Sequence, residues 1–192
     1  MRFFPGSIST DVARLILFNK PYGILSQFSA EGRFEGLAGF GFPADVYAAG
    51  RLDADSEGLL ILTDDGALQH RIAHPTAKLP KTYWAQVEGV PDEAELAALR
   101  GGVGLKDGVT LPAEARLIDE PALWPRNPPI RFRRDSPTSW LEIVIREGKN
   151  RQVRRMTASV GHPTLRLVRA RIGNWSLNDL QSGDWQQLEI NT

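Results

Sequence analysis

The sequence consists mainly of short β-strand patterns that helical patterns interrupt at irregular intervals. Apolar and β-branched residues indicate strands over residues 14–18, 46–49, 58–63, 81–88, 113–118, 140–146, 165–172 and 186–190. Helical signals cover only residues 65–73, 91–100 and 150–160. Because the helices do not alternate regularly with the strands, the order argues against a doubly wound parallel fold. We therefore predict an α+β fold with a mixed, mainly antiparallel sheet and flanking helices.

The 192 residues are enough for a single domain with a buried core. Residues 1–12 are predicted to form an N-terminal tail, and residues 13–192 to form the folded domain. A stretch rich in proline and arginine, residues 121–138, predicts an extended loop, which we place between two lobes. We expect Asp64 to cap the helix that follows it.

The composition excludes several classes of site and location. The chain has no cysteine, which excludes disulfides, thiolate metal sites and a cysteine nucleophile. It has only three histidines, which argues against a histidine-rich zinc site, and we expect no metal. It contains neither a signal-peptide core nor a run of about 18 apolar residues. We therefore expect a cytoplasmic protein without a membrane segment, and a monomer as the simplest state.

The charge is balanced in total but unevenly distributed along the chain. Basic and acidic residues number 23 each, yet residues 126–171 contain 12 basic residues and 3 acidic ones. Such a cationic segment suits a polyanion such as nucleic acid, and arginine is preferred for phosphate recognition and base stacking. A solvated surface with internal ion pairs is the alternative.

Two elements of this segment position arginines. In the helix over residues 150–160, one face is apolar, Arg151 and Arg155 point away from it, and Arg154 lies on the border. We expect Arg154 to reach a neighbouring cleft, and Arg151 and Arg155 to bind a polyanionic substrate. The strand over residues 165–172 mixes apolar residues with arginines, and we expect it to have one cationic face.

The acidic residues Asp53, Asp55 and Glu57 lie close together in a loop just before an apolar strand, and they are the densest cluster of candidate catalytic groups. The spacing partly fits a calcium-binding EF-hand loop, but the last ligand position holds Asp64 and the flanks resemble strands. A solvated acidic turn is the second interpretation. The third is a catalytic carboxylate in a cleft, where burial raises the pKa of an aspartate and an adjacent arginine opposes that rise.

Four ordered segments resemble a known enzyme family. The acidic segment GRLDADSEGLLILTDDG resembles the catalytic motif of pseudouridine synthases. Three further matches are NKPYGILSQF, KTYWAQVEG, and the pair EGKNRQVRRM and HPTLRLVRARIG, which resemble the motifs of the RsuA-type branch. The chain is thereby identified as a member of this branch.

The resemblance implies an enzyme of the pseudouridine synthase fold, with two lobes around a catalytic cleft and no S4 RNA-binding domain. It implies isomerisation of a uridine to pseudouridine in 23S ribosomal RNA, with base flipping and no cofactor. Asp53 matches the catalytic aspartate, Tyr83 the tyrosine that stacks on the base, and Arg154 the basic residue that pairs with the aspartate. Leu167 matches the apolar residue that packs the pocket, and Arg51 is expected to hold either the flipped nucleotide or the RNA backbone.

Two other functions use the same residues. An RNA-binding protein without catalysis would need the cationic surface but not Asp53. A metal-dependent nuclease would use Asp53, Asp55 and Glu57 together and would require magnesium. The resemblance itself gives Asp55 and Glu57 no role beyond a structural one.

Overall fold

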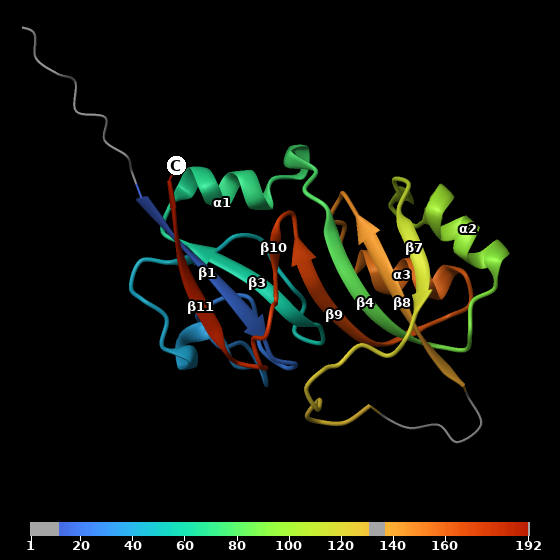
Figure 1. Ribbon diagram of the computed structural model, residues 1–192, viewed down its shortest axis with the longest axis horizontal. Helices are drawn as coiled ribbons and strands as arrows, with labels where there is room; N and C mark the ends of the chain where they lie inside the picture. The colour runs from blue at the N-terminus through green and yellow to red at the C-terminus, as the bar shows by residue number, and fades with distance from the viewer. Residues whose placement is uncertain (1–11, 131–136, 192) are drawn as a thin grey trace, which may run out of the picture.

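A computed structural model describes residues 12–130 and 137–191 and shows one long, twisted sheet with helices packed against it (Figure 1). The strands follow the order β11-β1-β3-β9-β4-β8-β7, and every neighbouring pair is antiparallel except β3 and β9. These strands are β1 (Val12–Lys20), β3 (Glu57–Thr63), β4 (Lys81–Glu88), β7 (Glu114–Ile118), β8 (Thr138–Ile145), β9 (Thr164–Ile172) and β11 (Trp185–Asn191). The predicted α+β fold with a mainly antiparallel sheet is confirmed.

Shorter elements complete the fold. The helices are α1 (Gly66–Ala73), α2 (Glu93–Gly101) and α3 (Gln152–Ser159). Two-residue strands are β2 (Tyr47–Ala48), β5 (Gly104–Leu105), β6 (Gly108–Val109) and β10 (Trp175–Ser176), and the 3-10 turns are η1 (Leu37–Phe40) and η2 (Pro75–Ala77). Within the described residues there is no S4 domain, and none of the helices is long and apolar enough to cross a membrane. Of the predicted tail, residues 1–12, only Val12 is described, and it is the first residue of β1.

The sheet has two halves that meet at a short parallel junction. Only two residue pairs join β3 to β9, one of which is Gly58 with Arg169. Gly58 has a φ of +102°, and a Cβ built there would lie 2.4 Å from the Arg169 carbonyl oxygen. A residue with a side chain would therefore push the strands apart where the halves are joined.

The two halves are buried in different ways. All seven residues of β3 are buried, because α1 covers one face of this half while Leu37 and Val46 pack on the other. In β4, by contrast, buried and partly exposed residues alternate from Tyr83 onward. The buried face of β4 packs against α2 and α3, and its partly exposed face is more open.

The caps of the helices differ in one place from the sequence prediction. Asp65, not Asp64, caps α1, and its side chain accepts a hydrogen bond from the Leu68 amide. Asp64 instead accepts hydrogen bonds from the backbone amide and the guanidinium of Arg14 on β1. A long-range ion pair therefore selects which of the two adjacent aspartates remains free to cap the helix.

The segment that follows β7 reaches the junction of β3 and β9 through Trp124. Its Trp124 donates a hydrogen bond from Nε1 to Glu57 Oε1 at 2.8 Å. Arg166 on β9 pairs with both oxygens of the same carboxylate at 2.9 Å and also donates to the Trp124 carbonyl oxygen. This buried cluster of Glu57, Arg166 and Trp124 fastens β3 to β9. Residues 131–136 of the predicted loop at 121–138 lie outside the described residues, and its assignment as a boundary between lobes stays a prediction.

The single cationic face expected for β9 is wrong. Arg166 and Arg169 are both buried, at 7% and 3% exposure, and only Arg171 is exposed. Arg166 is held by Glu57, whereas Arg169 donates to the carbonyl oxygens of Leu59 and Arg51. The arginines of this strand therefore mainly join the halves of the sheet.

We predict that Arg166→Met lowers the free energy of unfolding by about 3–5 kcal/mol, because it leaves the Glu57 carboxylate buried without its ion-pair partner. Urea denaturation measures this change. The control is Arg146→Met, since the Arg146–Glu114 pair is exposed and 3.8 Å apart; we expect it to cost less than about 1 kcal/mol. Equal losses in the two variants would contradict the role given to the buried cluster.

Candidate active site

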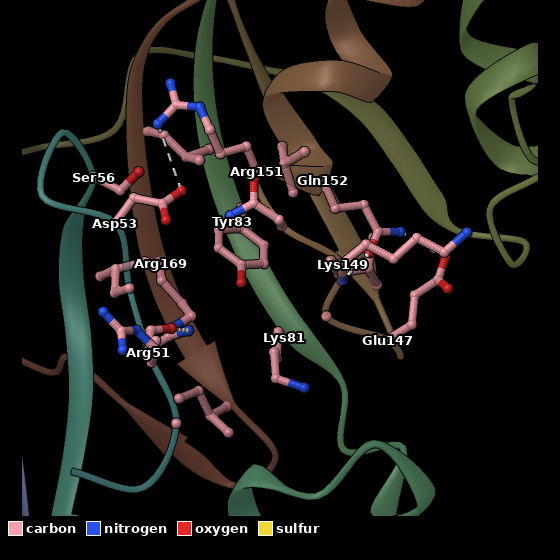
Figure 2. Close-up of a pocket in the computed structure, with 18 of the residues that line it drawn as sticks. Arg51, Asp53, Ser56, Lys81, Tyr83, Glu147, Lys149, Arg151, Gln152 and Arg169 are labelled. Atoms are coloured by element: carbon pink, nitrogen blue, oxygen red, sulfur yellow. Dashed lines mark hydrogen bonds and ion pairs between the residues drawn. The ribbon is translucent and has the colours of Figure 1, made fainter. Parts of the chain in front are cut away.

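A cavity of about 450 Å³ lies where the two halves of the sheet diverge (Figure 2). Residues 49–53 form one wall, residues 145–153 form another, and side chains of β4 and β9 form the floor. Its volume falls in the range of sites for small molecules and cofactors, about 300–1,000 Å³. The cavity therefore accepts a group the size of a nucleotide but not a duplex.

Asp53 lies on the loop that enters β3, and its side chain lines the cavity. The turn is closed by a hydrogen bond from the Ser56 amide to the Asp53 carbonyl oxygen, 3.0 Å long. The carboxylate is 38% exposed, and its nearest cationic partner is Arg151, whose Nη1 lies 3.7 Å from Oδ2. At this distance the guanidinium orients the carboxylate, yet the other carboxylate oxygen is available to a ligand.

Arg151 lines the cavity although the helical pattern predicted that it points away from the packed face. The reason is that α3 begins only at Gln152, and Arg151 is its N-cap with left-handed angles, φ 48° and ψ 33°. A residue outside the helix does not follow the helical angle of 100° per residue. The predicted assignment of Arg151 to substrate binding fits its position at the cavity.

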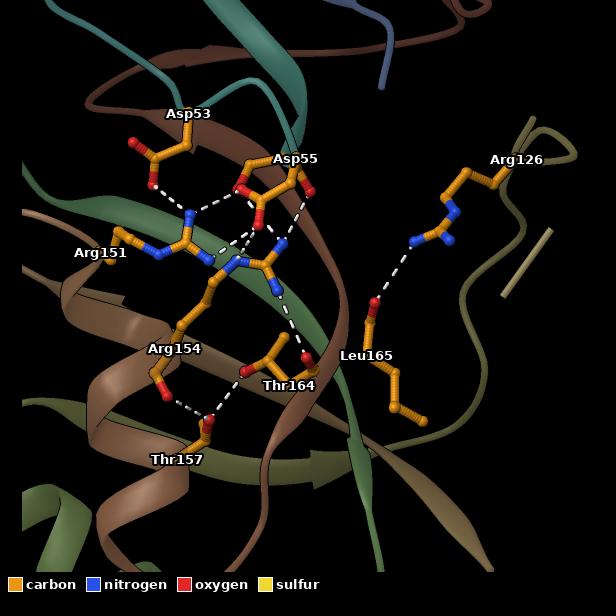
Figure 3. A network of polar contacts seen from close by, with 9 residues as sticks. Asp53, Asp55, Arg126, Arg151, Arg154, Thr157, Thr164 and Leu165 are labelled. Carbon is orange, nitrogen blue, oxygen red and sulfur yellow. Dashed lines mark hydrogen bonds and ion pairs between the residues drawn. The ribbon is translucent and has the colours of Figure 1, made fainter. Parts of the chain in front are cut away.

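Arg154 does not pair with Asp53, contrary to the prediction. Its guanidinium is 12% exposed and donates to the carbonyl oxygens of Asp55, at 2.7 Å, and Thr164, at 3.3 Å (Figure 3). Its Nε lies 3.6 Å from Asp55 Oδ2. Arg154 thus supports the loop that carries Asp53 and Asp55, and the guanidinium next to Asp53 comes from Arg151.

Three other predicted residues meet Asp53 in the same cavity. Tyr83 on β4 is 8% exposed and its ring faces the cavity, which Leu167 of β9 also lines. Arg51 is exposed at the rim. Arg155 is not among the lining residues, because both of its terminal nitrogens pair with the carboxylate of Asp107. The structure therefore brings Asp53, Tyr83, Leu167, Arg51 and Arg151 together and leaves Arg154 and Arg155 outside.

The three carboxylates of the acidic loop have different partners. Asp53 faces the cavity, Asp55 pairs with Arg151 and Arg154, and Glu57 is buried against Arg166. Among the described residues, no three acidic or histidine side chains converge as a metal site would require. This divergence, and the strand that begins at Glu57, disagree with the EF-hand interpretation and with a shared metal in a nuclease.

Two cationic residues of the floor were missed by the sequence analysis. Arg169 is buried, and within the described part of the chain it has only carbonyl oxygens as hydrogen-bond partners and no carboxylate. Lys81 also lines the cavity, and burial together with the charge of Arg169 lowers the pKa of its ammonium group. The regular alternation of β4 could have placed Lys81 on the same face as Tyr83, but nothing local to Arg169 indicates its partners.

A third cation, Lys20 at the end of β1, is completely buried. Its Nζ donates to the carbonyl oxygens of Pro21, at 2.9 Å, and Ile24, at 2.6 Å. Burial, and then the charge of Arg169, lower the pKa of Lys20 from 10.5 to about 7. Lys20 therefore holds the following residues, 21–24, in place by hydrogen bonds rather than by an ion pair.

Because the pKa of Lys20 is lowered on folding, the unfolded chain binds more protons between pH 7 and pH 10.5, and folding stability rises with pH there. We predict that the unfolding free energy of the wild type, minus that of Lys20→Met, increases from pH 7 to pH 10. Urea denaturation at several pH values measures it. A difference that does not change with pH would show that Lys20 titrates normally.

Comparisons with known proteins agree with this geometry. A model of the RNA pseudouridylate synthase family matches residues 14–159. A protein of Vibrio vulnificus (strain CMCP6) named ribosomal large subunit pseudouridine synthase E is 58% identical over 185 residues, which are 96% of this chain and 79% of that protein. The synthase of the same name from Xanthomonas campestris pv. campestris is 62% identical over 175 residues, covering 90% of this chain and 94% of that protein.

A solved structure gives the same result for the fold. The crystal structure of a pseudouridylate synthase superposes with a TM-score of 0.75 at 28% identity, covering 92% of this chain and 70% of that chain. These matches confirm the resemblance to the RsuA-type branch seen in the four motifs. The chain belongs to the RNA pseudouridylate synthase family.

Proposed function

We propose that this enzyme converts one uridine of 23S ribosomal RNA to pseudouridine, with Asp53 as the nucleophile or base and without a cofactor. The observation that carries the proposal is the meeting of Asp53, Arg151 and Tyr83 in one nucleotide-sized cavity. The names of the relatives support ribosomal RNA of the large subunit as the substrate. The proposal includes action as a monomer in the cytoplasm.

The target base must leave its stack to enter a cavity of about 450 Å³. Extrusion costs a few kcal/mol. Stacking of a base on an aromatic ring contributes about 1–3 kcal/mol, and Tyr83 offers such a ring on the cavity floor. Leu167 packs beside it and confines the base, while Arg51 at the rim is placed to contact the RNA backbone.

The reaction exchanges one bond of the base for another. The Asp53 carboxylate either attacks C1′ of the ribose or removes the proton from C2′, and in both routes the C1′–N1 bond breaks with its electron pair going to N1. The detached uracil then turns within the cavity, C5 bonds to C1′, the bond to Asp53 breaks or the proton returns to C2′, and the proton lost from C5 is replaced by one on N1. The product is an isomer of the substrate, so no oxidant or other co-reactant is consumed.

The cationic floor complements the charge of the detached base. Uracil leaves with a negative charge that spreads over N1 and its carbonyl oxygens. Arg169 and Lys81 carry positive charge to this part of the cavity and, within the described residues, neither has a carboxylate partner. Fixed charges in a site with little water stabilise such an ion more effectively than solvent does.

We predict that Asp53→Asn abolishes pseudouridine formation but leaves RNA binding and folding largely intact, because the amide is a poor nucleophile and base. The site is mapped by carbodiimide treatment and reverse transcription of rRNA from cells that lack the protein and express the variant. Asp119→Asn, the same change at an exposed position outside the cavity, is expected to restore wild-type modification.

Two results would contradict this proposal. Pseudouridine formed by Asp53→Asn would remove Asp53 from the reaction and would favour the alternative of an RNA-binding protein. RNA cleavage that depends on magnesium and stops with EDTA would favour the nuclease instead.

We also predict that Arg154→Ala lowers the rate of isomerisation by about 100-fold, because it releases the loop of Asp53 and a small displacement of reacting groups has effects of that size. Arg155→Ala on the same helix is expected to leave the rate near that of the wild type, since Arg155 faces Asp107 outside the cavity. Single-turnover assays with saturating RNA measure both. Equal losses would mean that Arg154 has no special connection to the site.

A further inference from the structure

Asp55 lies two residues after Asp53, and the proposed reaction gives it no role. Residues 49–56, between β2 and β3, form the loop that carries Asp53, and we call it the catalytic loop. The Asp55 carboxylate nevertheless makes the most extensive ion-pair contacts of this loop. Arg151 donates from Nη1 to Oδ1 at 3.0 Å and from Nη2 to Oδ2 at 2.8 Å, which is a bidentate pair (Figure 3). Such a pair fixes the plane of the guanidinium as well as its distance.

The same guanidinium is the cation next to Asp53. Its Nη1 lies 3.7 Å from Asp53 Oδ2, so Arg151 touches two carboxylates but hydrogen-bonds fully only to Asp55. Without Asp55, nothing in the described contacts of Arg151 would prevent it from closing on Asp53. A bidentate pair there would occupy both oxygens of the carboxylate that must act on the ribose.

Asp55 is itself held firmly. Its carbonyl oxygen accepts from Arg154 Nη2, and its carboxylate lies 3.6 Å from Arg154 Nε. Burial alone would raise the pKa of Asp55, but the hydrogen bonds and charges of Arg151 and Arg154 lower it below its ordinary value. Asp55 therefore remains ionised and immobile between the two arginines.

The backbone conformation of Arg151 also indicates that its surroundings fix the position of this residue. Its left-handed conformation is uncommon for a residue with a side chain and persists where the surroundings determine it. The pair with Asp55 joins residues 96 positions apart and connects the start of α3 to the catalytic loop.

We propose that Asp55 is a positioning residue that holds the Arg151 guanidinium beside Asp53 while keeping it from pairing fully with that carboxylate. The inference rests on the proposed function, since it assumes that Asp53 reacts. It gives the second carboxylate of the loop a part in catalysis that acts entirely through Arg151.

A double-mutant cycle tests this directly. We expect Asp55→Asn and Arg151→Met each to lower the single-turnover rate at saturating RNA by about 10- to 100-fold, as misplaced reacting groups do. If Asp55 acts through Arg151, the double variant is no slower than the slower single variant. The dissociation constant of the RNA is not expected to rise in Asp55→Asn, because removing an acidic group does not weaken binding to phosphates.

Two further variants separate positioning from folding. Asp107→Asn breaks the equivalent bidentate pair of Arg155 on the same helix, outside the cavity, and should leave the rate unchanged. Arg151→Lys keeps the charge at an exposed position but loses the bidentate geometry, and should be nearly as slow as Arg151→Met. This variant leaves Asp55 intact and so remains informative if Asp55→Asn fails to fold.

The proposal is overturned by a wild-type rate in Asp55→Asn or Arg151→Lys, by losses that multiply in the double variant, or by an equal loss in Asp107→Asn. These results are distinct from failure of the proposed function, which Asp53→Asn tests. An inactive Asp53→Asn together with multiplying losses would retain Asp53 as the reacting group and remove only the role of Asp55.

Discussion

The parallel junction between β3 and β9 is the constraint on which the site depends. It joins the half of the sheet that carries the Asp53 loop to the half that carries Tyr83, and only two residue pairs form it. Gly58 allows the two strands to approach each other, and the buried Glu57–Arg166 ion pair holds them together. Arg169 adds hydrogen bonds to the loop and to β3 across the same junction. The two halves diverge from this short contact (Figure 1). Residues of both halves line the cavity.

The charged residues around this cavity form two groups that lie at different places. Asp53 and Asp55 meet Arg151 and Arg154 at one side of the cavity. The buried Arg169 and the partly exposed Lys81 lie on the floor, and neither has a carboxylate partner among the described residues. The first arrangement orients the carboxylate that we propose as the reacting group, and the second suits the anionic base of the proposed reaction. A net charge of zero is therefore compatible with action on RNA, because the distribution of charge around the cavity matters more than the total.

Much of the fold could be predicted from the sequence, because the main strands show clear patterns. The strand predicted over residues 81–88 has the observed bounds, and the strand predicted over residues 46–49 contains β2. The two-residue strands β5, β6 and β10 were missed because they are too short to show a period. Asp53 and Tyr83 were found through motifs. The roles of Arg151, Arg154 and Arg169 were not predictable, since their partners lie about 100 positions away and only the tertiary fold selects them.

The most direct test of this account is a crystal structure of the Asp53→Asn variant bound to its RNA substrate. The account predicts that the target uridine is flipped into the cavity, with its base against Tyr83 and the ribose C1′ or C2′ about 3–3.5 Å from the side chain of residue 53. A target uridine that remains stacked in the RNA, or one bound with its ribose remote from residue 53, would contradict it.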